Sequence, residues 1–241
     1  MSARKGNVSV LRGARLEAMR PLQLQPLQPL QPLRAKKAAL RRQQQQQQQT
    51  PSARLLPEAA SQQTQARSRT LASGEGGGVN EEEVIRRLST SLWALASQED
   101  LVESEKRFSV GTVPKRAMDK YVQGIVGFLN DNHDGEATTA GVSPGLVAAV
   151  VAVIFVDRLM QRHKDFRVCR SNVHRLFLTA VTLAAKTWRD KAIPNKFMAA
   201  VGGIPLQQLN TFELDFCKMV GFDLSSSADE FWHSLAILLN A

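Results

Sequence analysis

The chain has 241 residues, enough for one or two domains, and its formal net charge at pH 7 is +9. Residues 1–78 hold 13 lysines and arginines against 3 acidic residues, whereas residues 79–241 hold 18 against 19. The positive charge therefore belongs to the N-terminal segment. A basic nucleic-acid-binding surface is not expected on the remainder of the chain.

Residues 1–78 are predicted to form a disordered, basic, low-complexity tail. Three Gln-Pro-Leu triplets end at Leu33, a glutamine tract runs from Gln43 to Gln49, and residues 74–78 are rich in glycine. Such segments bury too little apolar surface to offset the entropy lost on ordering. The proline spacing also fits a loose pattern for binding by SH3-type domains, although a plain spacer is the simpler interpretation.

Residues 79–241 are predicted to form one helical domain. Asn80 is a good N-cap for a first helix, and Ser143 followed by Pro144 is typical of another helix start. Ser227 or Asp229 is expected to cap the last helix. Because no segment alternates like a strand, the fold class is all-α. The expected helices span about 80–95, 115–130, 143–162, 171–188, 194–201 and 205–220, and a last one follows residue 227.

The helices at 143–162 and 171–188 are apolar nearly all round, so each should be surrounded by other helices. The longest apolar run, Leu146 to Val156, has 11 residues, whereas a membrane span needs about 20. Cys169 and Cys217 are the only cysteines, which fits a reducing compartment. We expect no membrane association and a location in the nucleus, the cytoplasm or both. A mitochondrial presequence is the alternative for the arginine-rich tail, but its prolines would break the helix that a presequence needs.

Motifs that carry chemistry are missing from the sequence. No histidine has the spacing of a helical zinc site, and no CxxC, P-loop or G-x-S-x-G pattern occurs. We therefore expect a non-catalytic protein without a cofactor or metal. Arg86-Arg87-Leu88-Ser89 fits a site for a basophilic protein kinase, with a solvated helix face as the simpler interpretation.

Two lone charges lie at the edges of apolar helices, Lys186 near the end of one and Glu213 on another. Spacing alone favours an extended lysine and a solvated glutamate, or a salt bridge between the two. The alternative is a surface that binds another protein.

Several segments resemble the cyclin family, and most closely the subgroup of the yeast phosphate-pathway cyclin and the U- and P-type cyclins. The resemblance covers about residues 82–224. It rests on the segment that begins Ser171-Asn172-Val173-His174-Arg175-Leu176, on AAVGGIP, LNTFELDF and GFDL after it, and on Phe108, Val113-Pro114, Tyr121, Ile125 and Asp157-Arg158-Leu159 before it.

This resemblance implies a single five-helix cyclin box over about 115–224, preceded by one additional helix. It implies a regulatory subunit that binds a cyclin-dependent serine/threonine kinase beside its C-helix and activates it, in the cell cycle or in phosphate signalling. Lys186 and Glu213 would then anchor the kinase, with Phe177, Leu183 and Phe212 contributing partly to the core and partly to the interface.

Two other functions remain as alternatives: a cyclin-fold scaffold in transcription, or a helical domain whose basic tail binds nucleic acid. The helix near residues 117–128 lacks the Met-Arg-Ala-Ile-Leu segment of cell-cycle cyclins, so docking of Arg-x-Leu substrates is not expected.

Overall fold

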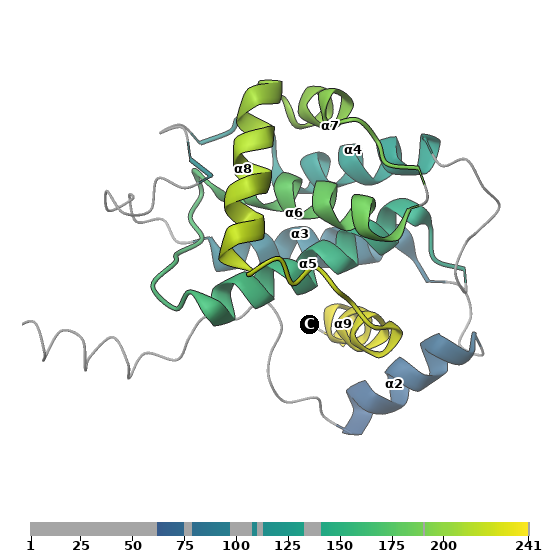
Figure 1. Ribbon diagram of the computed structural model, residues 1–241. Helices are drawn as coiled ribbons and strands as arrows, with labels where there is room; N and C mark the ends of the chain where they lie inside the picture. The colour runs from purple at the N-terminus through teal and green to yellow at the C-terminus, as the bar shows by residue number, and fades with distance from the viewer. Residues whose placement is uncertain are drawn as a thin grey trace, which may run out of the picture. The chain divides into compact units, whose positions relative to one another are not determined.

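The computed structural model describes residues 62–74, 79–96, 108–109, 113–132, 141–189 and 191–240 (Figure 1). Helices and connecting turns, without a β-strand, make up these ranges, which confirms the predicted all-α class. The proline triplets and the glutamine tract lie outside the described residues. The helices are α2 (Gln62–Ser73), α3 (Glu81–Leu95), α4 (Met118–Asp131), α5 (Pro144–Arg162), α6 (Val173–Trp188), α7 (Asn195–Gly202), α8 (Leu206–Met219) and α9 (Ala228–Asn240).

The predicted helix starts are confirmed by their caps. The Asn80 side chain accepts a hydrogen bond from the Glu83 amide at 3.1 Å, and Ser143 Oγ accepts one from the Leu146 amide at 3.3 Å. The α9 cap is Ser227, whose Oγ accepts from the Glu230 amide at 3.1 Å while the Glu230 carboxylate accepts from the Ser227 amide at 3.0 Å. These reciprocal bonds form a capping box, which satisfies amides that a helix start leaves open.

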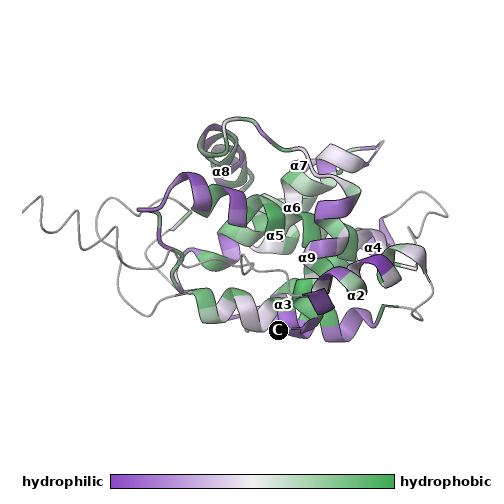
Figure 2. Cartoon of the chain, turned by 90° about the horizontal axis from the view of Figure 1, so that it is seen from below, coloured by the Kyte–Doolittle hydropathy of each residue, from purple (hydrophilic) through white to green (hydrophobic). Residues whose placement is uncertain are grey.

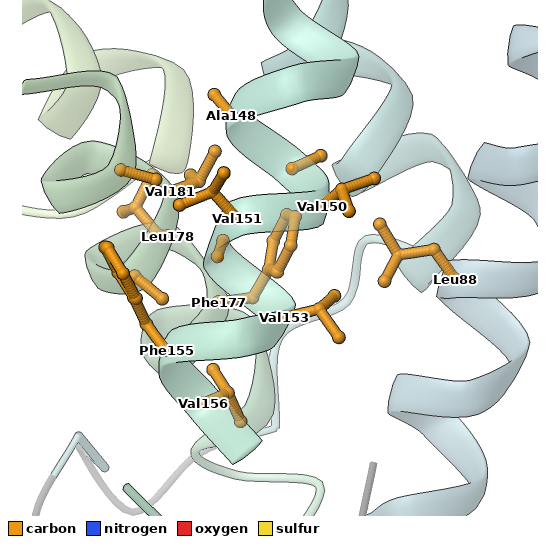
Figure 3. Close-up of a cluster of buried hydrophobic side chains, with 14 of the residues drawn as sticks. Leu88, Ala148, Val150, Val151, Val153, Phe155, Val156, Phe177, Leu178 and Val181 are labelled. Carbon is orange, nitrogen blue, oxygen red and sulfur yellow. The ribbon is translucent and has the colours of Figure 1, made fainter. Parts of the chain in front are cut away.

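Helices α5 and α6 lie at the centre of the domain. Helix α5 packs on α4, α6, α8 and α9, and α6 packs on α7 and α8 as well. Figure 2 shows hydrophobic residues gathered on these two helices, and Figure 3 shows α5 and α6 side chains meeting in one buried cluster. Burial of each large apolar side chain stabilises the fold by about 1.5–3 kcal/mol. The all-round apolar character of both helices is therefore explained by neighbours on several sides.

Helix α5 also has the length and composition of a membrane span, the one such helix among the described residues. The rest of the domain buries 89% of the most apolar 18-residue stretch of this helix. Its hydrophobicity is accounted for by this position in the core.

Helices α4 and α5 cross closely at Gly145. The Gly145 amide donates to Asn130 Oδ1 at 2.7 Å, and Asn130 Nδ2 donates to Glu81 Oε1 at 3.2 Å. Ser143 Oγ donates to the other oxygen of Glu81. A Cβ atom on Gly145 would lie 2.3 Å from the Val126 carbonyl oxygen, so only glycine permits this approach of the two backbones.

Two sequence-based expectations differ from the structure. The tail predicted as disordered over residues 1–78 contains α2, which packs on α9. The prediction failed there because α2 is polar and shows no apolar stripe, with Thr64 as its one buried residue. Ser89, in the kinase-site motif, does not lie on a solvated face: it is buried and its hydroxyl donates to the Ile85 carbonyl at 2.7 Å.

Substitution of Gly145 by alanine tests the crossing of α4 and α5. Gly145→Ala should lower the free energy of unfolding by about 1–3 kcal/mol, because the added methyl meets backbone that cannot rotate away. Gly127→Ala on α4 is the matched control, since nothing lies within 4 Å of its added Cβ. That control should raise stability by about 0.5–1 kcal/mol through helix propensity. Urea denaturation measures both, and equal effects would contradict the close crossing.

Candidate functional site

The two lone charges singled out in the sequence form an ion pair. Lys186 Nζ, at the end of α6, lies 2.7 Å from Glu213 Oε1 and 3.0 Å from Oε2 on α8. Packing of α6 on α8 brings them together across 27 positions of sequence. The Lys186 side chain is 33% exposed and that of Glu213 is 12% exposed. The salt bridge that spacing offered as one alternative is therefore the observed arrangement.

Asn195, the first residue of α7, completes this arrangement. Its Nδ2 donates to Glu213 Oε2 and to Asn210 Oδ1, the latter at 2.8 Å. Both oxygens of Glu213 are thus occupied. The Lys186 ammonium has three N–H donors, of which Glu213 takes two. At least one N–H of Lys186 is therefore left for water or for a protein partner.

A row of residues continues from this pair along α8. Cys217 lies one helical turn after Glu213, and its carbonyl accepts a hydrogen bond from the Phe222 amide at 2.7 Å. We call Lys186, Asn195, Glu213, Cys217 and Phe222 the docking strip. Lys186, Asn195 and Glu213 lie where α6, α7 and α8 meet, whereas Phe222 follows the other end of α8, next to α5 (Figure 1).

Phe222 closes the strip in an unusual conformation. Helix α8 ends in a Schellman motif, in which the Phe222 amide bonds to the Cys217 carbonyl and the Gly221 amide to the Lys218 carbonyl. Gly221 has φ +63°, and Phe222 follows with φ +59°. A left-handed conformation is uncommon for a bulky residue and costs about 1–2 kcal/mol. The result is a phenylalanine that is 67% exposed, the most exposed large apolar side chain among the described residues.

Two arginines of α5 hold the segment that carries Phe222. Arg158 Nη1 donates to the Asp223 carbonyl at 3.0 Å and to the Ser225 carbonyl at 2.8 Å. Arg162 donates to the Val220 carbonyl and, at 2.9 Å, to Asp223 Oδ2. The Ser225 hydroxyl and then the two arginines lower the pKa of the Asp223 carboxyl, so this contact is fully ionised at neutral pH. The Phe222 segment is therefore fixed to the core rather than held by Phe222 itself.

The apolar residues predicted beside the charges are core residues. Phe177 is 0% exposed and lies inside the cluster of Figure 3, so of the two roles that the sequence left open, core and interface, this conformation shows the core role. Leu183 and Phe212 are also buried, and the Phe212 ring lies 5.4 Å from the ring of Phe108. Helices that are apolar all round give no sequence signal for which residue faces outward. Phe222 has no role in the sequence analysis beyond its place in the GFDL segment, although the glycine directly before it is a signal for an exposed turn.

The strip offers charge, amide and apolar surface rather than a reactive centre. Among the described residues there is no group of three or more His, Cys, Asp or Glu side chains placed to hold a metal. Burial raises the pKa of the Cys217 thiol, and the Glu213 carboxylate raises it further, while Lys186 lowers it. Cys217 is therefore a weak nucleophile at neutral pH.

Comparison with known proteins gives a consistent result. A sequence model of the family described as Cyclin matches residues 35–224. Cyclin-U2-1 of Arabidopsis thaliana is 32% identical over 124 residues, which cover 52% of this chain and 50% of the relative. Cyclin-P4-1 of Oryza sativa subsp. japonica is 39% identical over 89 residues, which cover 37% and 42%.

A third relative comes from a fungus. The Nuc-1 negative regulatory protein preg of Neurospora crassa is 34% identical over 93 residues, which cover 39% of this chain and 19% of that protein. The chain thus spans about half or less of the length of these three relatives.

The pH dependence of Cys217 alkylation tests the geometry of the strip. Iodoacetamide should modify Cys217 with a midpoint at higher pH than a free thiol, because burial and Glu213 disfavour the thiolate. Glu213→Gln should move that midpoint to lower pH, whereas Asp215→Asn on the same helix should not. Mass spectrometry of the Cys217 peptide gives the rates. An unmoved midpoint in Glu213→Gln would place the carboxylate away from the thiol.

Proposed function

Because the chain belongs to the cyclin family, whose members are non-catalytic regulatory proteins, we propose that it binds and activates a cyclin-dependent serine/threonine kinase through the docking strip. The observation that carries this proposal is the preformed Lys186–Glu213 pair, whose glutamate lies on the helix that ends at the exposed Phe222 segment. A cell-cycle role and a phosphate-signalling role are both open under this proposal.

Preorganisation is the property that suits the strip for binding. Glu213 and Asn195 hold each other, and Glu213 holds Lys186, before any partner arrives. A long lysine side chain would otherwise lose rotamer freedom on binding. Charge-assisted hydrogen bonds from this group to kinase backbone would each contribute about 1.5–3 kcal/mol. Phe222 would add apolar area that is already exposed, without a rearrangement of the core.

Activation by such a strip is a matter of differential binding. A protein kinase transfers phosphate only when the glutamate of its C-helix pairs with the ATP-binding lysine. A rigid helical surface that fits the C-helix in this position alone shifts the kinase towards its active state. The strip lies on α6, α7, α8 and the turn after α8, all of which pack on the buried core or bond to it, so it can hold a partner element without being deformed.

The alternatives have less support from the described residues. Residues 79–241 hold 18 basic residues against 19 acidic ones, so binding to a nucleic-acid backbone would depend on the basic tail of residues 1–78 alone. A scaffold in transcription would use the same fold, and it predicts no gain in kinase activity. Activation of a kinase therefore separates the two functions.

Exchange of the two strip charges tests the proposed interface. The double variant Lys186→Glu, Glu213→Lys keeps an internal ion pair, so its melting temperature should stay within a few degrees of the parent. The charges that face the partner are reversed, so binding to the cyclin-dependent kinase should weaken at least about tenfold, with matching loss of activation. Pull-down with candidate cyclin-dependent kinases and a histone phosphorylation assay measure both.

A matched control exchanges another ion pair, Glu83 and Arg86 on α3, whose helix packs on α4 and α9. That exchange should leave kinase binding unchanged. Full activation by the folded strip variant would rule out the proposed interface. Loss of activation in both exchanged proteins would point to a nonspecific charge effect instead.

Replacement of Phe222 by glycine separates stability from binding. Glycine tolerates φ +59°, so Phe222→Gly should leave the free energy of unfolding unchanged or raise it by up to about 1 kcal/mol. Loss of the exposed ring should weaken kinase binding about tenfold, since burial of a phenylalanine contributes about 1.5–3 kcal/mol. Phe197→Ala is the control, because Phe197 is 47% exposed but is about 200° around α7 from Asn195. Thermal melts measure the stability of each variant, and binding titrations measure its affinity for the kinase. Unchanged binding by Phe222→Gly would show that Phe222 is not part of the interface.

A further inference from the structure

Helix α2 is held on the domain mainly by polar contacts. Arg67 Nη1 donates to the Leu239 carbonyl at 3.1 Å and to Asn240 Oδ1 at 2.6 Å, both at the end of α9. Asn240 Nδ2 donates to Thr64 Oγ1 at 3.2 Å, and Leu71 is the one apolar α2 residue packed against the core. A helix of 12 residues is marginal in water by itself. Local unfolding of α2 should therefore cost far less free energy than unfolding of the domain.

Helix α2 also carries a sequence that a basophilic protein kinase can recognise. Such kinases bind a substrate in extended form and contact an arginine three residues before the acceptor hydroxyl. Within the described ranges, the serines and threonines with an arginine at that position are Thr70, Ser89 and Thr90. Thr70 follows Arg67, and a second arginine, Arg69, directly precedes it.

The structure separates these three hydroxyl groups. Ser89 is buried, and Thr90 is exposed but lies on α3, a helix with five buried residues. Neither can become extended unless α3 leaves the core. Thr70 is exposed on α2, its hydroxyl donates only to the Ala66 carbonyl of its own helix among the described residues, and α2 has one buried residue.

We propose that Thr70 is a phosphorylation site for a basophilic serine/threonine kinase, and that its phosphate releases α2 from α9. In this reaction Oγ1 of Thr70 attacks the γ-phosphorus of ATP, and a new P–O bond forms as the bond to the β–γ bridging oxygen breaks. ADP leaves, and the hydroxyl proton passes to a base of the modifying kinase. The site is separate from the docking strip, so this proposal does not depend on the proposed function.

Two physical effects would follow from the phosphate. Thr70 lies in the last turn of α2, where a charge of about −1.5 to −2 opposes the helix dipole and weakens that end of the helix. Arg67 lies one turn earlier on the same side, within reach of the phosphate oxygens. Its guanidinium would be drawn from the Leu239 carbonyl and Asn240, which are the contacts that hold α2 on α9.

Charges around the α2–α9 contact add to this effect. Arg69 and Ser68 of α2 line an open hollow together with Asp229, Glu230 and His233 of α9. One basic residue of α2, Arg69, therefore shares this hollow with two acidic residues of α9 in the unmodified protein. A phosphate on α2 would reduce that complementarity.

The test treats the full chain with ATP and the catalytic subunit of a kinase that requires arginine three residues before its target. Mass spectrometry should find phosphate on Thr70 at least tenfold faster than on Thr90, and Thr70→Ala should abolish that product. A synthetic peptide of residues 62–74 reports recognition without any fold. If the peptide is modified and the chain is not, α2 does not open and the proposal is overturned. If neither is modified, the sequence is not a substrate and the proposal is also overturned.

Hydrogen exchange tests the release. Amides of residues 62–73 and of the α9 end should exchange about tenfold faster after phosphorylation, while amides of α5 and α6 stay protected. Arg67→Ala should accelerate exchange in the same two regions without phosphate, and Thr90→Ala should not. Phosphate on Thr70 with unchanged exchange would overturn the release mechanism. An unaffected Arg67→Ala would remove Arg67 as the contact that holds α2.

Discussion

Close packing between α5 and α6 is the constraint on which the rest of the structure depends. Both helices are buried over most of their surface, so the positions of α4, α7, α8 and α9 are set by the sides of this pair that they cover. The end of α6 then places Lys186, and the end of α5 places Arg158 and Arg162. The end of α6 supplies a charge to the docking strip, and the end of α5 fixes the segment that carries Phe222. A change in the α5–α6 contact would move both parts of the strip together.

Helix positions could be predicted largely from local signals. Asn80, Ser143 with Pro144, and Ser227 satisfy amides of their own helix, so their effect is contained in a few adjacent residues. The start of α4 is less well defined by sequence: its cap, Ala117, is extended and makes no side-chain cap, and the helix begins three residues after the expected Lys115. Helix α2 was missed because its position depends on Arg67 reaching across the fold to α9, which no local pattern records.

The candidate site was predictable in its residues but only partly in its arrangement. Two charges at the edges of apolar helices marked Lys186 and Glu213, yet their direct contact depends on how α6 packs on α8. The sequence could not show whether Phe177 faces the core or the surface, because the helix that carries it is apolar on every side. Phe222 gains its exposure from a left-handed backbone and from two arginines more than 50 positions earlier in the chain. The ion pair, the burial of Phe177 and the exposure of Phe222 all depend on tertiary packing, which the periodicity of a sequence does not predict.

The position of Arg67 bears on how the domain can be separated from its tail. A fragment that begins at Val79, as composition suggests, would lack the helix whose guanidinium occupies the last carbonyls of α9. Those acceptors would face water, and the side of α9 that α2 packs on would lose its cover. A fragment that begins before Gln62 would keep α2 over this side of α9. The shorter fragment would expose it and would be prone to self-association.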